Sequence, residues 1–207
     1  DWKFVEGGKA YGFMIKEDGT LWAVGTNTDG VQGTSDGVDH KTPAQVGTDT
    51  DWAYVTSVRF WGYTALAIKT DGTLWGWGSN SSNQLGTGNT GKNETTPIQI
   101  GTDNNWKTVT MGVAHTMAIK TDGTLWGWGN NSSGQLGNGT QTSVKTPVQI
   151  GTDTDWSYVK AIDNRTYAVK QDGTLYVCGS NAYGLLGLNQ PEEELVSNYN
   201  TLTLASN

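Results

Sequence analysis

Cysteine, histidine and proline are scarce in this 207-residue chain, which has one cysteine, two histidines and four prolines. A single cysteine, Cys178, excludes an internal disulfide framework, and we expect it to be a buried packing thiol. With only two histidines, His40 and His115, the chain has few side chains suited to a catalytic or metal-binding centre. No nucleophile elbow and no phosphate-binding loop accompanies the serines and glycines, so the sequence predicts neither an enzyme nor a cofactor.

Charge and long apolar runs are also in short supply. Charged residues make up 16% of the chain, the net charge is −7, and the 13 basic residues are scattered without a run. Neutralising nucleic-acid phosphates needs clustered Lys and Arg, so we expect no nucleic-acid partner. No stretch resembles a membrane span or a signal peptide.

Glycine and tryptophan, by contrast, are abundant, at 29 and 10 residues. Many of them belong to one twelve-residue stretch, 118–129, that occurs four times. The copy at 67–78 is identical to it, and the copies at 14–25 and 168–179 differ from it at several positions. The Asp-Gly pairs of the four copies lie 53, 51 and 50 residues apart. A period near fifty residues indicates a repeat architecture.

Each copy has the pattern of a β-hairpin, because an apolar run precedes Asp-Gly and an aromatic run follows it. The second strand alternates Leu125, Gly127 and Gly129 with Trp126 and Trp128. Glycine on one face would let a neighbouring sheet approach, and tryptophan on the other would fill the gap. A sheet that is apolar on both faces must be covered on both, so neighbouring copies are expected to stack.

A full unit is predicted to hold about four strands, the number in a propeller blade. In the third copy these are 106–110, 117–120, 125–129 and 146–151. The prediction is an all-β propeller of four-stranded antiparallel blades in one repeat domain, residues 1–207. The blade-like units cover about 1–51, 52–105, 106–155 and 156–190.

The repeat resembles a known family in four motifs of this sequence: Gly112-Val113-Ala114-His115-Thr116, Asp-Gly-Thr-Leu-Trp, Trp-Gly-x-Asn and Gly134-Gln135-Leu136-Gly137. It is similar to the regulator of chromosome condensation repeat in its bacterial form, to about Asn189. The resemblance implies four-stranded blades round an axis, commonly seven. It implies little about function, since relatives include nucleotide-exchange factors, signalling scaffolds and a secreted β-lactamase inhibitor protein.

The two ends of the chain do not determine how the blade-like units assemble. After Asn189 the repeat is lost, but the alternation within 199–205 predicts one more strand, which could close the first blade. Three assemblies remain: a four-bladed ring, a fragment of a longer propeller, or an arc that associates with a second copy. Unpaired ends would favour self-association.

The candidate binding surface consists of the connections that precede the second strand of each unit. The copies share their framework but differ here, and equivalent loops of a propeller emerge on one face. Aromatic residues and arginine are the typical hot-spot residues of protein interfaces. Alternatively, Phe60 and Trp61 plug the central channel, and His115 has a structural hydrogen-bonding role. The candidate residues are Tyr11, Arg59, Phe60, Trp61, Tyr63, His115, Asn164 and Arg165.

These residues favour a non-enzymatic binding module or scaffold that recognises a protein partner. The alternatives are a lectin-like carbohydrate-binding propeller, a nucleotide-exchange factor for a small GTPase, and a spacer in a larger surface protein. The resemblance to the bacterial form of the repeat, together with the Thr/Asn/Gly-rich surface and the scarcity of cysteine, suggests an exported or surface-attached bacterial protein.

Two further patterns have a structural interpretation beside a functional one. The pairs Asp49/Asp51 and Asp153/Asp155 fall short of the six to eight oxygens that calcium takes, so a turn-capping role is favoured. Asn-x-Ser/Thr sequons are frequent, but a loop-rich repeat that uses Asn and Ser in turns supplies many by chance. They begin at Asn80, Asn93, Asn130, Asn131, Asn138 and Asn164.

Overall fold

The computed structural model describes residues 1–58, 62–189 and 198–205. Within them the chain forms four antiparallel four-stranded sheets, each built from four consecutive strands and called blades 1 to 4 below. Blade 1 contains β1 (Trp2–Gly7), β2 (Tyr11–Lys16), β3 (Leu21–Gly25) and β4 (His40–Gln45). Blade 2 contains β5 (Trp52–Ser57), β6 (Thr64–Lys69), β7 (Leu74–Gly78) and β8 (Glu94–Gln99). Blade 3 contains β9 (Trp106–Met111), β10 (His115–Lys120), β11 (Leu125–Gly129) and β12 (Val144–Gln149). Blade 4 contains β13 (Trp156–Ile162), β14 (Arg165–Lys170), β15 (Leu175–Ser180) and β16 (Asn198–Leu204).

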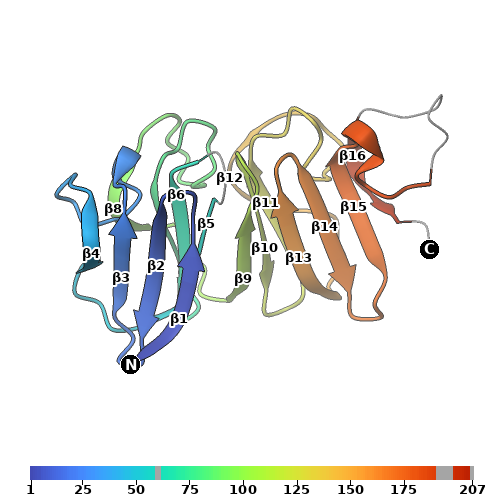
Figure 1. Cartoon of the computed structure of the whole chain (residues 1–207). Helices are drawn as coiled ribbons and strands as arrows, with labels where there is room; N and C mark the ends of the chain where they lie inside the picture. Colours follow the sequence, from blue (N-terminus) through green and yellow to red (C-terminus); the bar gives the residue numbers. More distant parts are fainter. Residues whose placement is uncertain (59–61, 190–197, 206–207) are drawn as a thin grey trace.

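The blades stand side by side in chain order, with the N-terminus at one end of the row and the C-terminus at the other (Figure 1). The first strands of consecutive blades approach one another, β1 with β5, β5 with β9 and β9 with β13. These strands therefore lie on the inner side of the row, and the fourth strands form its outer side. The predicted β-propeller of four-stranded antiparallel blades is confirmed, and the four blades of the described residues form an open row rather than a closed ring.

The strand predicted near the C-terminus is present, but the prediction that it completes blade 1 is wrong. β16 pairs with β15, so that Leu204 lies opposite Tyr176, and it completes blade 4 rather than blade 1. The amide of Ala205 donates to the carbonyl of Leu175, as the amide of Ile150 does to Leu125 in blade 3. The reason is that blade 1 already has its own fourth strand, β4, so its outer edge is occupied.

The hydrophobic core consists of three clusters, one at each junction between consecutive blades. The tryptophans that open blades 2, 3 and 4, Trp52, Trp106 and Trp156, are 2–3% exposed at these junctions. Trp2 occupies the same place in blade 1 and is 46% exposed, because no blade among the described residues covers that side of blade 1. The prediction that the copies stack to cover one another's faces is confirmed.

The tryptophans in the second half of β7 and β11 link neighbouring blades by hydrogen bonds. The indole Nε1 of Trp77 donates to the carbonyl of Val31 at 2.7 Å, and that of Trp128 donates to Gln84 at 2.9 Å, each in the preceding blade. In blade 4 the thiol of Cys178 takes this position and donates to Gln135. Cys178 is fully buried, as predicted, and burial raises the pKa of its thiol to about 12.

The Asp-Gly turns at the other end of the hairpins are held by their own side chains. In blade 3 the carboxylate of Asp122 accepts from the amide and the hydroxyl of Thr124, and that hydroxyl accepts from the indole of Trp126. Gly123 alone of this pair has a positive φ, +80°. Asp122 therefore closes the turn by accepting hydrogen bonds, not by adopting a left-handed conformation.

The carboxylate pairs considered as calcium ligands bind lysine instead. Lys69 Nζ lies 2.7 Å from Asp49 and 3.0 Å from Asp51, and it sits over the rings of Trp52 and Trp75. Burial lowers the pKa of Lys69, but the hydrogen bonds to both carboxylates raise it more, so the net shift is upward. Lys170 makes the equivalent pairs with Asp153 and Asp155 in blade 4. Among the described residues, no cluster of His, Cys, Asp or Glu suits a metal ion, and no helix is long and apolar enough to cross a membrane.

Candidate functional site

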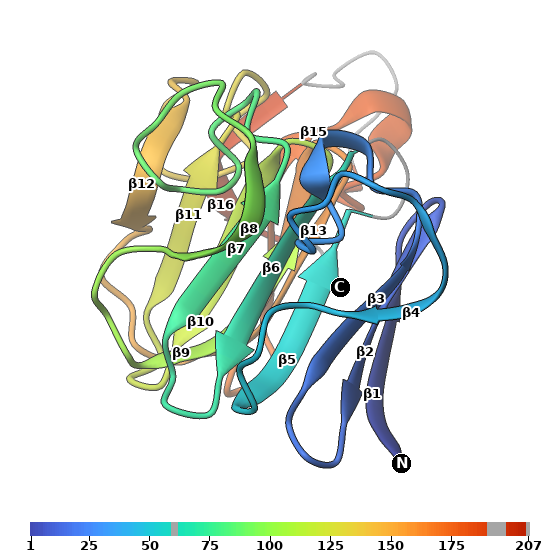
Figure 2. The same cartoon turned by 90° about the vertical axis from the view of Figure 1, so that its left-hand side faces the viewer.

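The connections between the first and second strands of the four blades lie on one face of the arc, the upper side of Figures 1 and 2. We call this the inner-connection face; its described members are residues 8–10, 58, 62–63, 112–114 and 163–164. Neighbouring connections are joined by hydrogen bonds. The amide of Val113 donates to the carbonyl of Asp163 at 2.9 Å, and the hydroxyl of Tyr11 donates to Val58 at 3.0 Å. The connections of blades 3 and 4, and those of blades 1 and 2, are therefore held to one another.

A pocket of about 180 Å³ opens at the inner side of this face. It lies where the first strands of blades 2, 3 and 4 end. Its lining is mainly apolar, and Ile162, at 42% exposure, stands at its rim. Nine residues line it: Ser57, Val58, Met111, Gly112, Val113, Lys160, Ala161, Ile162 and Asp163.

The charged groups at this pocket come from blade 4. Lys160 and Asp163 are the charged residues of its lining. The guanidinium of Arg165 lies 3.5 Å from the Asp163 carboxylate, at the long end of a hydrogen bond. The one carboxylate residue of the lining is thus paired with an arginine of the same blade.

Tyr11 does not belong to the exposed surface, which corrects its prediction as a contact residue. Its side chain is 5% exposed, and its hydroxyl donates to the carbonyls of Val58 and Gly62 in blade 2. Burial raises the pKa of this hydroxyl well above its ordinary value. Tyr11 therefore holds the neighbouring connection in place from below. A large aromatic residue in a loop-like segment points inward here because the gap between blades 1 and 2 accommodates it.

His115 is also removed from the surface, and its structural interpretation is the correct one. It is fully buried, and its Nε2 lies 3.0 Å from the hydroxyl of Thr166 in blade 4. That hydroxyl donates onward to the carbonyl of Gln135, so Nε2–H of His115 is the donor to Thr166. Burial lowers the pKa of His115 to about 3. It is a neutral link between blades 3 and 4, not a binding residue.

The remaining candidates divide into two groups. Asn164 is exposed on the inner-connection face, while Tyr63 and Arg165 are half-buried there, with the ring of Tyr63 centred 6.2 Å from that of Tyr11. Arg59, Phe60 and Trp61 lie outside the described residues. The structure therefore retains Tyr63, Asn164 and Arg165 on the face.

Sequence reasoning missed the pocket itself. Met111, Lys160 and Ile162 belong to strands, and their contribution depends on three strand ends meeting across about a hundred residues of chain. One signal existed: the copies differ at the strand end as much as in the connection, with Ser57, Met111 and Ala161 at equivalent positions.

A second cavity, of about 290 Å³, lies at the outer side of the junction between blades 1 and 2. Trp75 and Asp49 line it together with the hydroxyl groups of Ser35, Thr48 and Thr96. Lys69 covers one face of the Trp75 ring at 4.5 Å, which reduces the aromatic surface available to a ligand.

The described fold is that of a β-propeller repeat protein, and its inner-connection face is made of the loops between the first and second strands of the blades. Residues 71–119 and 122–169 match the family model for the "Regulator of chromosome condensation (RCC1) repeat", and residues 106–135 match a second model of the same description. The chain therefore contains RCC1 repeats.

The chain is similar to several curated proteins over part of their length. It is 30% identical over 128 residues to the ultraviolet-B receptor UVR8 of Arabidopsis thaliana, which covers 60% of this chain and 28% of that receptor. The chain thus spans less than a third of this relative. The solved structure of Prp20p from Saccharomyces cerevisiae matches 100% of this chain with a TM-score of 0.84 at 20% identity, and covers 51% of that protein. Yeast RCC1 (Prp20) bound to Kap60 matches 100% of this chain with a TM-score of 0.85, over 49% of that protein. At this identity the two structures support the fold alone.

Proposed function

We propose that this chain is a non-enzymatic binding module that recognises a protein partner through the inner-connection face. The observation that supports this most directly is the apolar pocket of about 180 Å³ at the inner side of that face. Loops on a rigid scaffold are where binding function concentrates, and the stacked blades provide that scaffold. The pocket gives the loops a place to anchor one side chain of a partner.

The size and charge of the pocket suggest what kind of segment it binds. An apolar cavity of about 150 Å³ holds a benzene-sized group, so there is room for one aliphatic or aromatic side chain. Lys160 in its lining favours a carboxylate next to that side chain. The partner segment would therefore carry an apolar residue flanked by Asp or Glu.

The relatives support a protein-binding role without defining the partner. The structure of Prp20p was described together with the binding of that protein to Gsp1p and histones, and yeast RCC1 was solved bound to Kap60. Those interactions belong to those proteins. For this chain they make protein recognition the favoured class of function.

The test is selection of binding peptides from a random display library, followed by affinity measurement by calorimetry. Ile162→Asp and Lys160→Glu should each weaken the selected peptides by about tenfold or more, because they remove the apolar rim and the cation. Lys107→Glu is the matched control, since Lys107 is an exposed lysine at the start of the equivalent strand β9, at the far end from the pocket. It should leave affinity unchanged. Selected peptides that ignore both pocket variants would contradict the proposal.

Carbohydrate binding is the second candidate, because the cavity beside Trp75 combines an indole with hydroxyl and carboxylate groups. A glycan array distinguishes the two. Saturable binding that Asp49→Ala abolishes and Ile162→Asp leaves intact would favour the carbohydrate site.

A further inference from the structure

The lining of the pocket at the inner-connection face includes a position where blade 3 lacks a side chain. Gly112 stands six residues after the tryptophan that opens blade 3, and the equivalent residues of blades 2 and 4 are Val58 and Ile162. All three line the pocket. Consecutive blades follow one another along the row, so Val58 and Ile162 flank Gly112 from either side. The hollow therefore lies where a row of apolar side chains is interrupted.

The interruption is a consequence of the buried ring beneath the connection. A Cβ at Gly112 would lie 2.5 Å from Nδ1 of His115 and 2.5 Å from the carbonyl oxygen of Asp163, so a side chain has no room there. Blade 1 has the same combination, since a Cβ at Gly8 would lie 2.5 Å from Cζ of the buried Tyr11. In both blades a large ring three residues after the glycine keeps this position bare.

The surroundings of the hollow are fixed by packing and hydrogen bonding. Met111 is 7% exposed and belongs to the same core cluster as Val58, and Ala161 is 2% exposed. The amide of Val113 donates to the carbonyl of Asp163 at 2.9 Å, which ties the connection of blade 3 to that of blade 4. A cavity formed in advance binds its ligand without the cost of ordering its own walls.

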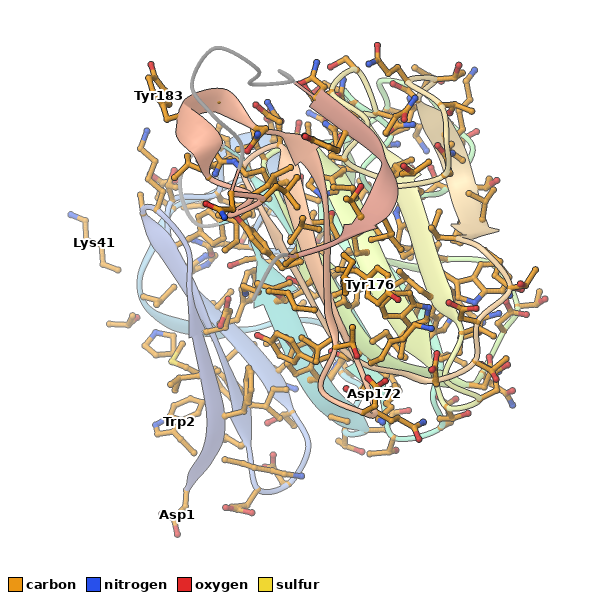
Figure 3. The ribbon with its side chains drawn as sticks, turned by 90° about the vertical axis from the view of Figure 1, so that its right-hand side faces the viewer. Asp1, Trp2, Lys41, Asp172, Tyr176 and Tyr183 are labelled. Atoms are coloured by element: carbon orange, nitrogen blue, oxygen red, sulfur yellow. The ribbon has the colours of Figure 1, made fainter. Side chains whose placement is uncertain are left out.

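The pocket lies at the end of the blades that is remote from the Asp-Gly turns. In Figure 3, Asp172 of the blade 4 turn stands at the bottom of the molecule and Tyr183 stands at the top, on the side of the inner-connection face. The carboxylates of the turns therefore do not contribute to the chemistry of the pocket.

We propose that the pocket takes a single six-membered aromatic ring, the side chain of Phe or Tyr in the partner segment; this inference rests on the proposed protein-binding function. A cavity of about 150 Å³ holds benzene, so a pocket of about 180 Å³ accommodates a phenyl or phenol ring but not the two fused rings of tryptophan. The thioether of Met111 favours a ring over an aliphatic group of equal size, because sulfur makes favourable contacts with aromatic rings. The bound ring lies between Val58 and Ile162, in the place that a side chain at Gly112 would take.

The experiment is an NMR titration of the 207-residue chain labelled with ¹³C at its methionine methyl groups. The probes are benzyl alcohol, the non-aromatic cyclohexylmethanol and the larger 3-methylindole. Benzyl alcohol should shift the Met111 signal upfield in a saturable way, and it should bind at least about threefold more tightly than the other two probes. Met14 and Met117, the only other methionines, should not shift, because Met14 belongs to blade 1 and Met117 is fully buried.

Two variants test the wall and the sulfur of the pocket. Ile162→Ala removes one wall and should weaken benzyl alcohol about threefold or more. Val38→Ala is the matched control, because Val38 is an exposed valine in the loop before β4, and it should leave the affinity unchanged. Met111→Leu keeps the apolar volume without the sulfur, so it should narrow the preference for benzyl alcohol over cyclohexylmethanol in ligand-observed NMR. The thermal midpoint of each variant verifies that it remains folded.

The outcomes separate this inference from the proposed function. Benzyl alcohol that leaves the Met111 signal in place up to its solubility limit overturns the aromatic ring, and so do equal affinities for benzyl alcohol and cyclohexylmethanol. Library peptides that depend on Ile162 but carry Leu or Val as the anchor would support protein recognition and contradict the ring. Benzyl alcohol bound at Met111 with no peptide selected would support the ring site and contradict protein recognition.

Discussion

At the scale of single residues, some side chains that the sequence predicts to lie in variable surface loops are instead packed between blades. His115 is the clearest example. It is fully buried and linked through Thr166 to Gln135, so it joins blade 3 to blade 4 in its neutral form. Burial lowers its pKa to about 3, which is below the ordinary value for an unfolded chain, roughly 6.5.

This shift makes stability depend on pH. Between pH 6.5 and 3 the unfolded chain binds a proton at His115 that the folded chain excludes, so stability is lost as pH falls through this window. From pH 7 to pH 5 the loss is about 2 kcal/mol, or a fall of roughly 4–8 °C in the thermal midpoint of a chain of this size.

The measurement is the thermal midpoint against pH for wild type and two variants. His115→Gln keeps a donor for Thr166 but cannot titrate, so it should remove this part of the slope between pH 7 and 5. His40→Gln changes the only other histidine, which is partly exposed near Asp36, and should retain the slope. Equal slopes in all three proteins would show that His115 becomes protonated within the fold.

At the scale of strands and turns, the local patterns of the sequence are sufficient to predict the hairpins but not to predict which strand pairs with the last one. Asp-Gly followed by Thr-Leu-Trp closes a turn through contacts within four residues, and such contacts can be inferred from the sequence. The alternation of Leu202 and Leu204 correctly predicts a strand. It contains no information on whether β16 meets β15 or β1, because that choice depends on which outer edge is vacant.

The glycines that receive the interblade tryptophans are a second feature at this scale. Gly86 has a φ of +79°, and a Cβ there would lie 2.6 Å from Nε1 of the buried Trp128. Gly101 has a similar φ of +66°, but no described atom lies within 4 Å of the position of its Cβ. A comparison of alanine variants at Gly86 and Gly101 therefore separates the free-energy cost of backbone strain from that of overpacking.

We expect Gly101→Ala to destabilise the chain by about 1–2 kcal/mol, the cost of a left-handed backbone with a Cβ. Gly86→Ala should cost about 1–3 kcal/mol more, because it also displaces Trp128. Urea unfolding of dilute protein measures both. Equal losses would mean that the junction between blades 2 and 3 can widen without cost.

At the scale of the whole molecule, stacking of the copies follows from the sequence, while the centre of the candidate site does not. Sheets with apolar side chains on both faces have to be sandwiched, and the three junction clusters are the result. The pocket arises only when Val58, Met111 and Ile162 are brought together from three blades. The prediction for Tyr11 is wrong for the same reason, since its environment is formed by a neighbouring blade.

The most direct test of the account is hydrogen exchange of the chain with and without a selected peptide. Bound peptide should slow exchange at the ends of β5, β9 and β13 and in the connections that follow them, around residues 57–58, 111–113 and 160–164. The Asp-Gly turns on the opposite face should exchange at unchanged rates. Protection confined to those turns, or to the outward faces of blades 1 and 4, would contradict recognition through the inner-connection face.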